Sequence, residues 1–358
     1  NIGYLKEVQF WLENMFVKDT RDVFPEPLLD MRWTTCTACR TEYARTVCPK
    51  CVGAATAAVI QTITVRGTVT ATRVFRTPGT IVYSTVENGR LCWLMHDGKS
   101  FRREDDSIAI VGALDPFLRF KLQGDRTYVG RDHTVAVLHG GQVVEQFVAD
   151  RFKQSPLFAT TSAHRYWIQG GRLLRDSAFA PDRIGDVVAG QTQFWVGSDF
   201  GFGYSRPGNR LFGFVFEAAG QGINDAVPMP VCNGPITDAT CVFGSDRAWC
   251  FIATYENGKG THRCIIVNRR GQVLAQHEAV EGDGSWLGAL HGVCATGQFL
   301  LVATDHGIVR VEVANGICTV TREFPDTEPF VEAGSTLHAA ADGLYVVGTN
   351  EITKLTIR

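Results

Sequence analysis

The chain has 358 residues, of which 45% are hydrophobic and 20% are charged, and its formal net charge is −2. This composition predicts a globular protein with a large core, in one or two domains. The near-neutral charge argues against non-specific nucleic-acid binding, and no apolar run reaches the roughly 18 residues that a membrane-spanning helix needs. No secretory signal pattern is present at the start of the sequence.

Residues 2–17 carry apolar side chains at intervals of three and four, which predicts an amphipathic helix. The apolar face consists of Leu5, Val8, Trp11, Leu12, Met15 and Phe16. Because a face of this size is unfavourable in water, we expect it to dock a protein partner or a neighbouring domain. The alternative is that the helix folds back on its own chain. Pro25 and Pro27 then predict an extended connector that ends near residue 31.

Two C-x2-C pairs follow within residues 32–52, and their members are Cys36, Cys39, Cys48 and Cys51. Four thiolates in this spacing predict one tetrahedral, structural Zn²⁺ with no open position for chemistry. The alternative is four unrelated buried or disulfide-bonded cysteines. Basic and aromatic residues surround the pairs, but we expect this module to dock protein rather than nucleic acid. Residues 53–58 (GAATAA) read as a linker.

From residue 59 to residue 358 the sequence predicts an all-β domain, because short Val-, Ile- and aromatic-rich runs are cut by Gly, Asn and Asp. Seven copies of a strand–turn–strand pattern recur, with a mean spacing of about 44 residues. Their anchor residues are Tyr83, Tyr128, Tyr166, Phe194, Trp249, Leu300 and Tyr345. Such a period is typical of four-stranded propeller blades. The short step of 28 residues from Tyr166 to Phe194 predicts a truncated blade.

Residues 59–358 therefore resemble a seven-bladed β-propeller of the WD40-like class, although the Trp-Asp and Gly-His signatures of WD40 repeats are missing. The resemblance implies inner strands such as 117–123 and 238–243, and outer strands such as 142–148 and 318–324. The last copy lacks an outer strand, so we expect residues 58–67 to supply it and close the ring.

The cysteine module resembles a short zinc ribbon. Helix, linker and cysteine pairs together are similar to the region that follows the kinase-like domain of some bacterial serine/threonine kinase-like proteins. This resemblance implies the accessory or sensory half of a larger signalling or defence protein, to which a chain beginning at Asn1 is suited. No kinase residue is carried over.

The remaining cysteines lie in apolar runs, and their odd number predicts reduced core thiols. They are Cys92, Cys232, Cys241, Cys250, Cys264, Cys294 and Cys318. Together with a zinc–thiolate site they favour a cytoplasmic location.

No catalytic constellation is identifiable. The histidines lack metalloprotease spacing, although His164 and His291 are placed near inner strands and are candidates for the central channel. Residues 280–288 predict a turn with Trp286 packed between blades, and residues 201–203 (GFG) predict part of a long hairpin. The acidic segments 103–106 and 324–330 are expected to be solvated corners of blades.

These patterns favour a non-enzymatic interaction scaffold, with the propeller as binding platform and the zinc ribbon and helix as docking module. The expected partner is a protein, within a larger assembly. The rival hypothesis is an enzyme with its active site in the propeller channel. The predicted inner strands are mostly apolar or small, which favours the scaffold.

Overall fold

The structure is a computed structural model of the chain, and it describes residues 34–35, 40, 42–43 and 63–357. The chain divides into two compact units, residues 1–61 and residues 62–358. In the first unit the short strands β1 (Thr34–Thr35) and β2 (Glu42–Tyr43) pair antiparallel. The predicted helix at 2–17, with its apolar face, and the four cysteines of the predicted zinc site lie outside the described residues.

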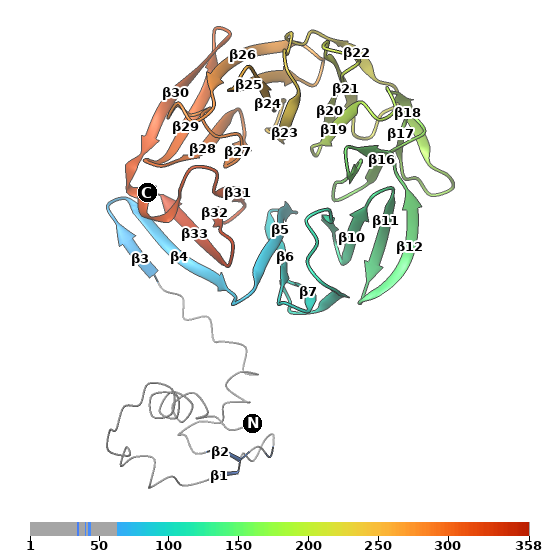
Figure 1. Cartoon of the computed structure of the whole chain (residues 1–358). Helices are drawn as coiled ribbons and strands as arrows, with labels where there is room; N and C mark the ends of the chain where they lie inside the picture. The colour runs from blue at the N-terminus through green and yellow to red at the C-terminus, as the bar shows by residue number, and fades with distance from the viewer. Residues whose placement is uncertain (1–33, 36–39, 41, 44–62, 358) are drawn as a thin grey trace. The chain divides into compact units, whose positions relative to one another are not determined.

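The second unit is a ring of antiparallel sheets (Figure 1). In the described part of the chain, six sheets have four strands each, connected in chain order. The first three consist of β5 (Thr80–Glu87), β6 (Arg90–His96), β7 (Ser100–Arg103) and β8 (Ile108–Val111); β9 (Arg119–Gln123), β10 (Arg126–Arg131), β11 (Thr134–His139) and β12 (Gln142–Val148); β15 (Phe158–Thr160), β16 (Arg165–Gln169), β17 (Arg172–Arg175) and β18 (Asp182–Asp186). The other three consist of β19 (Thr192–Val196), β20 (Phe200–Ser205), β21 (Phe212–Glu217) and β22 (Asn224–Val227); β23 (Ile236–Phe243), β24 (Arg247–Glu256), β25 (Lys259–Asn268) and β26 (Val273–Val280); β27 (Val293–Thr296), β28 (Phe299–Thr304), β29 (Gly307–Ala314) and β30 (Ile317–Phe324).

The first strand of a sheet lies toward the centre of the ring and the last at its rim, as β23 and β26 show (Figure 1). This is the architecture of a β-propeller. The predicted inner segments 117–123 and 238–243 coincide with the first strands β9 and β23 to within two residues. The predicted outer segments 142–148 and 318–324 coincide with the last strands β12 and β30 to within one residue. Within the part of the chain that the structure describes, no helix is long and apolar enough to cross a membrane.

A five-stranded sheet joins the two ends of the ring. Its order is β3 (Ile63–Arg66), β4 (Val69–Arg76), β33 (Glu351–Ile357), β32 (Gly343–Val347) and β31 (Thr336–Ala340). The prediction that residues 58–67 close the ring is therefore wrong. The strand that pairs with β33 is β4, and β3 pairs with the other edge of β4 as a fifth strand. The physical reason is burial: Val69 and Ala71 are buried in the core, whereas Ile63 and Val65 are exposed.

Two of the anchor residues of the predicted repeat lie in a different strand of their sheet from the others. Tyr128, Tyr166 and Trp249 lie in the second strands of their sheets, whereas Tyr83 and Phe194 lie in the first strands β5 and β19. No blade is truncated at the short step, since β15–β18 form a complete sheet. The second-strand counterpart of Phe194 is Tyr204, which follows Tyr166 by 38 residues and precedes Trp249 by 45.

The predicted hairpin around residues 201–203 is a strand instead, β20. Gly201 and Gly203 lie directly beside the rings of Phe216 and Phe214, so that a Cβ atom at either glycine would collide with a ring. Glycine is thus what allows large aromatic residues on β21 to pack across β20. The interpretation failed because a glycine-rich run is more typical of a turn than of a buried strand.

The core consists of apolar clusters between adjacent sheets. The largest contains Trp249, Phe251, Leu287, Leu300 and Val311, from the two sheets that follow residue 235 and the loop that joins them. Trp286 is buried there and stacks on His277, with ring centroids 5.1 Å apart, as the sequence predicted for this turn. The seven cysteines outside the zinc motif are free and buried, which confirms that they are core thiols.

The two acidic segments differ from each other. Asp105 and Asp106 are exposed in the turn between β7 and β8, as predicted for a solvated corner, whereas the segment 324–330 is partly packed against the fold. Residues 325–330 form the 3-10 helix η2 (Pro325–Phe330), in which Asp326 accepts hydrogen bonds from the amide and hydroxyl of Thr68 at 3.0 and 3.2 Å. Phe330 packs against the core between the last two sheets. In the segment 103–106, Arg103 is buried and donates to the carbonyls of Gly124 and Arg126 in the next sheet. Each segment thus contains a residue, Arg103 or Asp326, whose hydrogen bonds to another part of the fold could not be predicted from the acidic composition of the segment.

Candidate functional site: the central channel

A cavity of about 1160 Å³ lies where the first strands converge. Its wall includes residues of β5, β9, β15, β19 and β23, which come from five different sheets. Because the first strand ends its sheet, each of these strands has one edge without a strand partner in the part of the chain that the structure describes. The channel is therefore bordered by backbone edges as well as by side chains.

An extra hairpin forms part of the wall. Strands β13 (Arg151–Phe152) and β14 (Ser155–Pro156) pair with each other between β12 and β15. Lys153, in the left-handed conformation with φ of 56°, is at its tip. The Lys153 ammonium donates to the carbonyls of Ile236 and Thr237 at 3.1 and 3.3 Å. The hairpin thus contacts β23, although two complete sheets intervene along the chain. Sequence reasoning missed it because two-residue strands have no detectable periodicity.

The residues that line the cavity are predominantly basic among their charged members. They include Arg119, Lys121, Arg151 and Lys153, and one acidic residue, Asp238. The formal balance of these five is +3, on a chain whose net charge is −2. In the described ranges none of the four cations makes an ion pair with a carboxylate, whereas arginines such as Arg102, Arg165 and Arg263 do.

Neutral groups orient two further cations besides Lys153. The Arg119 guanidinium donates to the carbonyls of Pro116 and Leu118 at 2.8 and 2.9 Å. The Lys121 ammonium lies 5.3 Å from the centroid of the Tyr83 ring. Carbonyl dipoles and an aromatic face hold a cation in place without cancelling its charge. The channel therefore retains a positive potential that can attract an anion.

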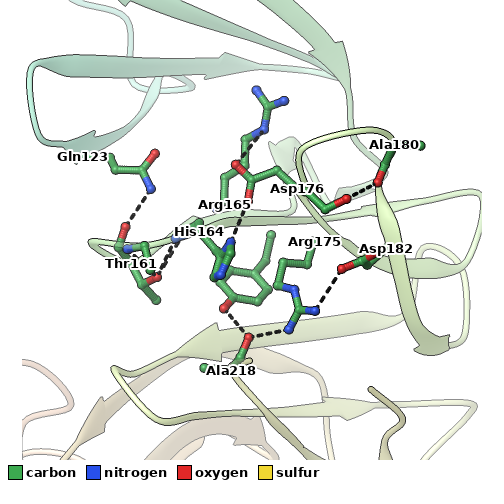
Figure 2. Close-up of polar contacts among 12 residues, drawn as sticks. Gln123, Thr161, His164, Arg165, Arg175, Asp176, Ala180, Asp182 and Ala218 are labelled. Atoms are coloured by element: carbon green, nitrogen blue, oxygen red, sulfur yellow. Dashed lines mark hydrogen bonds and ion pairs between the residues drawn. The ribbon is translucent and has the colours of Figure 1, made fainter. Parts of the chain in front are cut away.

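The two histidines that the sequence placed near the channel have different positions. His291 precedes β27, and its Nε2 lies 2.7 Å from the carboxylate of the channel residue Asp238. This hydrogen bond lowers the pKa of Asp238 and raises the pKa of His291, and burial opposes both shifts. His164 is not a channel residue: it lies in the turn between β15 and β16, with Nδ1 3.2 Å from Asp176 (Figure 2).

The surroundings of His164 join three sheets (Figure 2). On one side, Arg165 donates to both carboxylate oxygens of Glu145 on β12, at 2.7 and 2.6 Å. On the other side, Arg175 donates to the carbonyls of Ala218 and Gly220 at 2.7 and 3.0 Å. The hydroxyl of Tyr166 donates to the same Ala218 carbonyl at 2.8 Å. These residues hold sheets together and are not among those that line the channel, so the role of the network is structural.

One contact has a geometry that also occurs in enzymes. Ser84 Oγ on β5 lies 2.8 Å from His338 Nε2 on β31, between two adjacent first strands. Burial lowers the pKa of His338 to about 4, so the imidazole is neutral at pH 7. A neutral imidazole beside a hydroxyl can serve as a general base. No described residue is seen to orient its second nitrogen.

Among the described residues no group of three or more His, Cys, Asp or Glu side chains is arranged to hold a metal ion. The predicted zinc ligands Cys36, Cys39, Cys48 and Cys51 lie outside those residues. Their role stays a prediction.

No protein-family model matches the chain, and no curated protein matches it. Solved structures with some likeness include a prolyl endopeptidase, at 12% identity and a TM-score of 0.44 over 80% of this chain and 51% of that chain. A puromycin-hydrolysing peptidase from Mycobacterium tuberculosis is 12% identical, with a TM-score of 0.42 over 80% of this chain and 58% of that chain. The WD40 domain of SCAP from fission yeast is 11% identical, with a TM-score of 0.32 over 79% and 63%. The chain thus spans about half the length of the two peptidases. Because these TM-scores are low, the assignment of the fold rests on the sheet topology and not on this likeness.

Proposed function

We propose that the propeller is a non-enzymatic binding platform for a protein partner, with the central channel as its binding surface. The observation that supports this most is the set of four cations that β9 and the β13–β14 hairpin bring to one cavity, none of which makes an ion pair with a carboxylate among the described residues. A rigid sheet scaffold loses little conformational entropy when a partner binds. The location that fits this role best is the cytoplasm, since the seven buried cysteines are free thiols.

The platform is proposed to be a complete seven-bladed ring. Its blades are the six four-stranded sheets and the five-stranded sheet in which β4 pairs with β33. Pairing of the first described strands of the unit with its last strand closes the ring without leaving a long unpaired edge on β33.

We further propose that residues 1–52 are a docking module. β1 and β2 lie on either side of Cys36 and Cys39 in the sequence, as the hairpin of a zinc ribbon requires. One structural Zn²⁺ held by Cys36, Cys39, Cys48 and Cys51 would order this module, and the apolar face at residues 5–16 would contact the partner. The same arrangement suits the accessory half of a larger kinase-like protein.

Panning a phage-displayed peptide library against the immobilised full chain tests the platform. Enriched peptides are expected to slow amide hydrogen exchange in the first strands β9 and β23. If no peptide is enriched, or if protection is confined to rim strands such as β12 and β30, the channel is not a binding surface.

The rival enzyme hypothesis has one specific observation in its favour, the contact of Ser84 with His338. A fluorophosphonate probe reacts with serines that a general base activates. We expect no labelling of the native chain. Labelling that disappears in Ser84→Ala would favour a hydrolase over a binding platform.

A further inference from the structure

We infer that the channel binds a carboxylate-rich, extended peptide segment of the partner protein. The inference rests on the proposed platform function and adds the chemical class of its ligand. Four properties of the channel lead to it: its charge, its free strand edges, the packing of its aromatic rings and its size.

The charge selects an anion. Arg119, Lys121, Arg151 and Lys153 come from the β9 region and from the β13–β14 hairpin, so they converge on one cavity from two separate segments. Asp238 is the one carboxylate among the lining residues, and it is already bonded to His291. Asp238 interacts electrostatically with Lys153, so it offsets part of the positive charge, but an entering carboxylate would still meet an excess of cations.

The free strand edges favour a peptide. The strands β5, β9, β15, β19 and β23 are each the terminal strand of their sheet, so one backbone edge of each has no strand partner among the described residues. An extended peptide can form main-chain hydrogen bonds to such an edge. The protein already shows that these groups can be used from the channel side, since Lys153 donates to the Ile236 and Thr237 carbonyls of β23.

The aromatic rings argue against single-stranded nucleic acid, which needs exposed faces on which bases stack. Phe243 packs edge-on against Phe200 at 5.3 Å, and Phe158 is buried. The Lys121 ammonium lies over the Tyr83 ring. Phe117, at 43% exposure, is the ring most available, and it suits an apolar side chain between acidic ones.

The size of the cavity favours a chain segment over a small metabolite. Its volume of about 1160 Å³ exceeds the roughly 300–1,000 Å³ of typical small-molecule pockets. A compact anion would reach only some of the cations, whereas an extended peptide can pass Lys121 and Arg151 in turn.

Fluorescence anisotropy with a labelled octaglutamate peptide tests the inference on the full chain. We expect saturable binding that weakens as salt is raised. The double variant Lys121→Gln/Arg151→Gln should lower the affinity at least tenfold, because it removes two cations and no hydrogen bond of the fold. The matched control is Arg90→Gln/Arg172→Gln, which removes two exposed arginines that do not line the cavity. It should bind as the native chain does, and thermal unfolding checks that both variants are folded.

Other outcomes overturn the inference in distinguishable ways. Equal loss of affinity in both double variants would show general surface attraction and not a channel site. Tighter, channel-dependent binding of oligothymidine or of inorganic tripolyphosphate would replace the acidic peptide by another class of anion. If octaglutamate fails to bind while library peptides still protect β9 and β23, the acidic class is wrong and the platform stands. If neither binds, both proposals fail.

Discussion

At the scale of single residues, two histidines near the first strands differ in their hydrogen-bond partners. His338 is neutral beside Ser84, whereas His291 is bonded to Asp238, so the two imidazoles have opposite pKa shifts. The reason is their partners: a hydroxyl offers no charge to offset desolvation, whereas a carboxylate does.

His338 makes the stability of the fold depend on pH. Burial lowers its pKa from 6.5 to about 4, so between these values the unfolded chain binds a proton that the folded chain does not. The free energy of unfolding should therefore fall as the pH falls from about 6.5 to 4, by up to about 3 kcal/mol, with no further loss from this group below pH 4. Urea unfolding across this range measures it.

The matched variant for this measurement is His338→Gln, which retains a hydrogen-bonding group toward Ser84. Its free energy of unfolding should lack that part of the pH dependence. His291 contributes with the opposite sign, because its raised pKa adds stability as the pH falls. A native chain and a variant with the same slope between pH 6.5 and 4 would refute the assignment to His338.

At the scale of elements, neighbouring sheets are joined by arginines that donate to carbonyl groups. Arg103 on β7 reaches Gly124 and Arg126, and Arg175 on β17 reaches Ala218 and Gly220. Both arginines end the third strand of a sheet and are buried. The same contact between sheets thus occurs twice. It could not be predicted from the sequence, because a charged residue at a strand end is usually exposed.

Arg175→Leu should destabilise the propeller by about 3 kcal/mol, because the Gly220 carbonyl and the Asp182 carboxylate lose the Arg175 donor and the Ala218 carbonyl keeps only the Tyr166 hydroxyl. The comparison is Arg172→Leu on the same strand, whose side chain is exposed and whose effect should stay within about 0.5 kcal/mol. Urea denaturation measures both. Similar effects of the two substitutions would contradict the role assigned to Arg175.

The four cysteines of the N-terminal module predict one zinc per chain. Elemental analysis of protein purified without chelator should give this ratio, because four thiolates in two C-x2-C pairs complete a tetrahedral site. Cys36→Ser/Cys48→Ser should lose the metal, whereas Cys241→Ser should keep it, since Cys241 is a buried core thiol of the propeller. Metal retained by the double variant would exclude these ligands.

At the scale of the whole molecule, closure of the ring depends on β4. A chain that begins at Thr68 retains β4, and its propeller should unfold as cooperatively as that of the full chain. A chain that begins at Thr77 lacks β4 and exposes the edge of β33 together with the core around Leu355. We expect it to lose cooperative unfolding and to aggregate. Thermal unfolding and light scattering distinguish the two chains, and equal behaviour would disprove closure by β4.

The sequence by itself determined the β-propeller architecture, the ring closure by terminal strands and the buried thiols. It could do so because apolar periodicity and strand length are local properties of the chain. It misplaced the phase at Tyr83 and Phe194, because first and second strands of a blade are equally apolar when both faces are buried.

Only the tertiary structure decided which segment closes the ring and which residues form the channel. Residues 63–66 and 69–76 are both suited to strands, and it is burial against β33 that selects the second. Lys121, Arg151 and Asp238 are distant in the sequence, and the curvature of the ring brings them to one cavity. Such long-range proximity follows from how sheets pack around an axis, a property that no local pattern encodes.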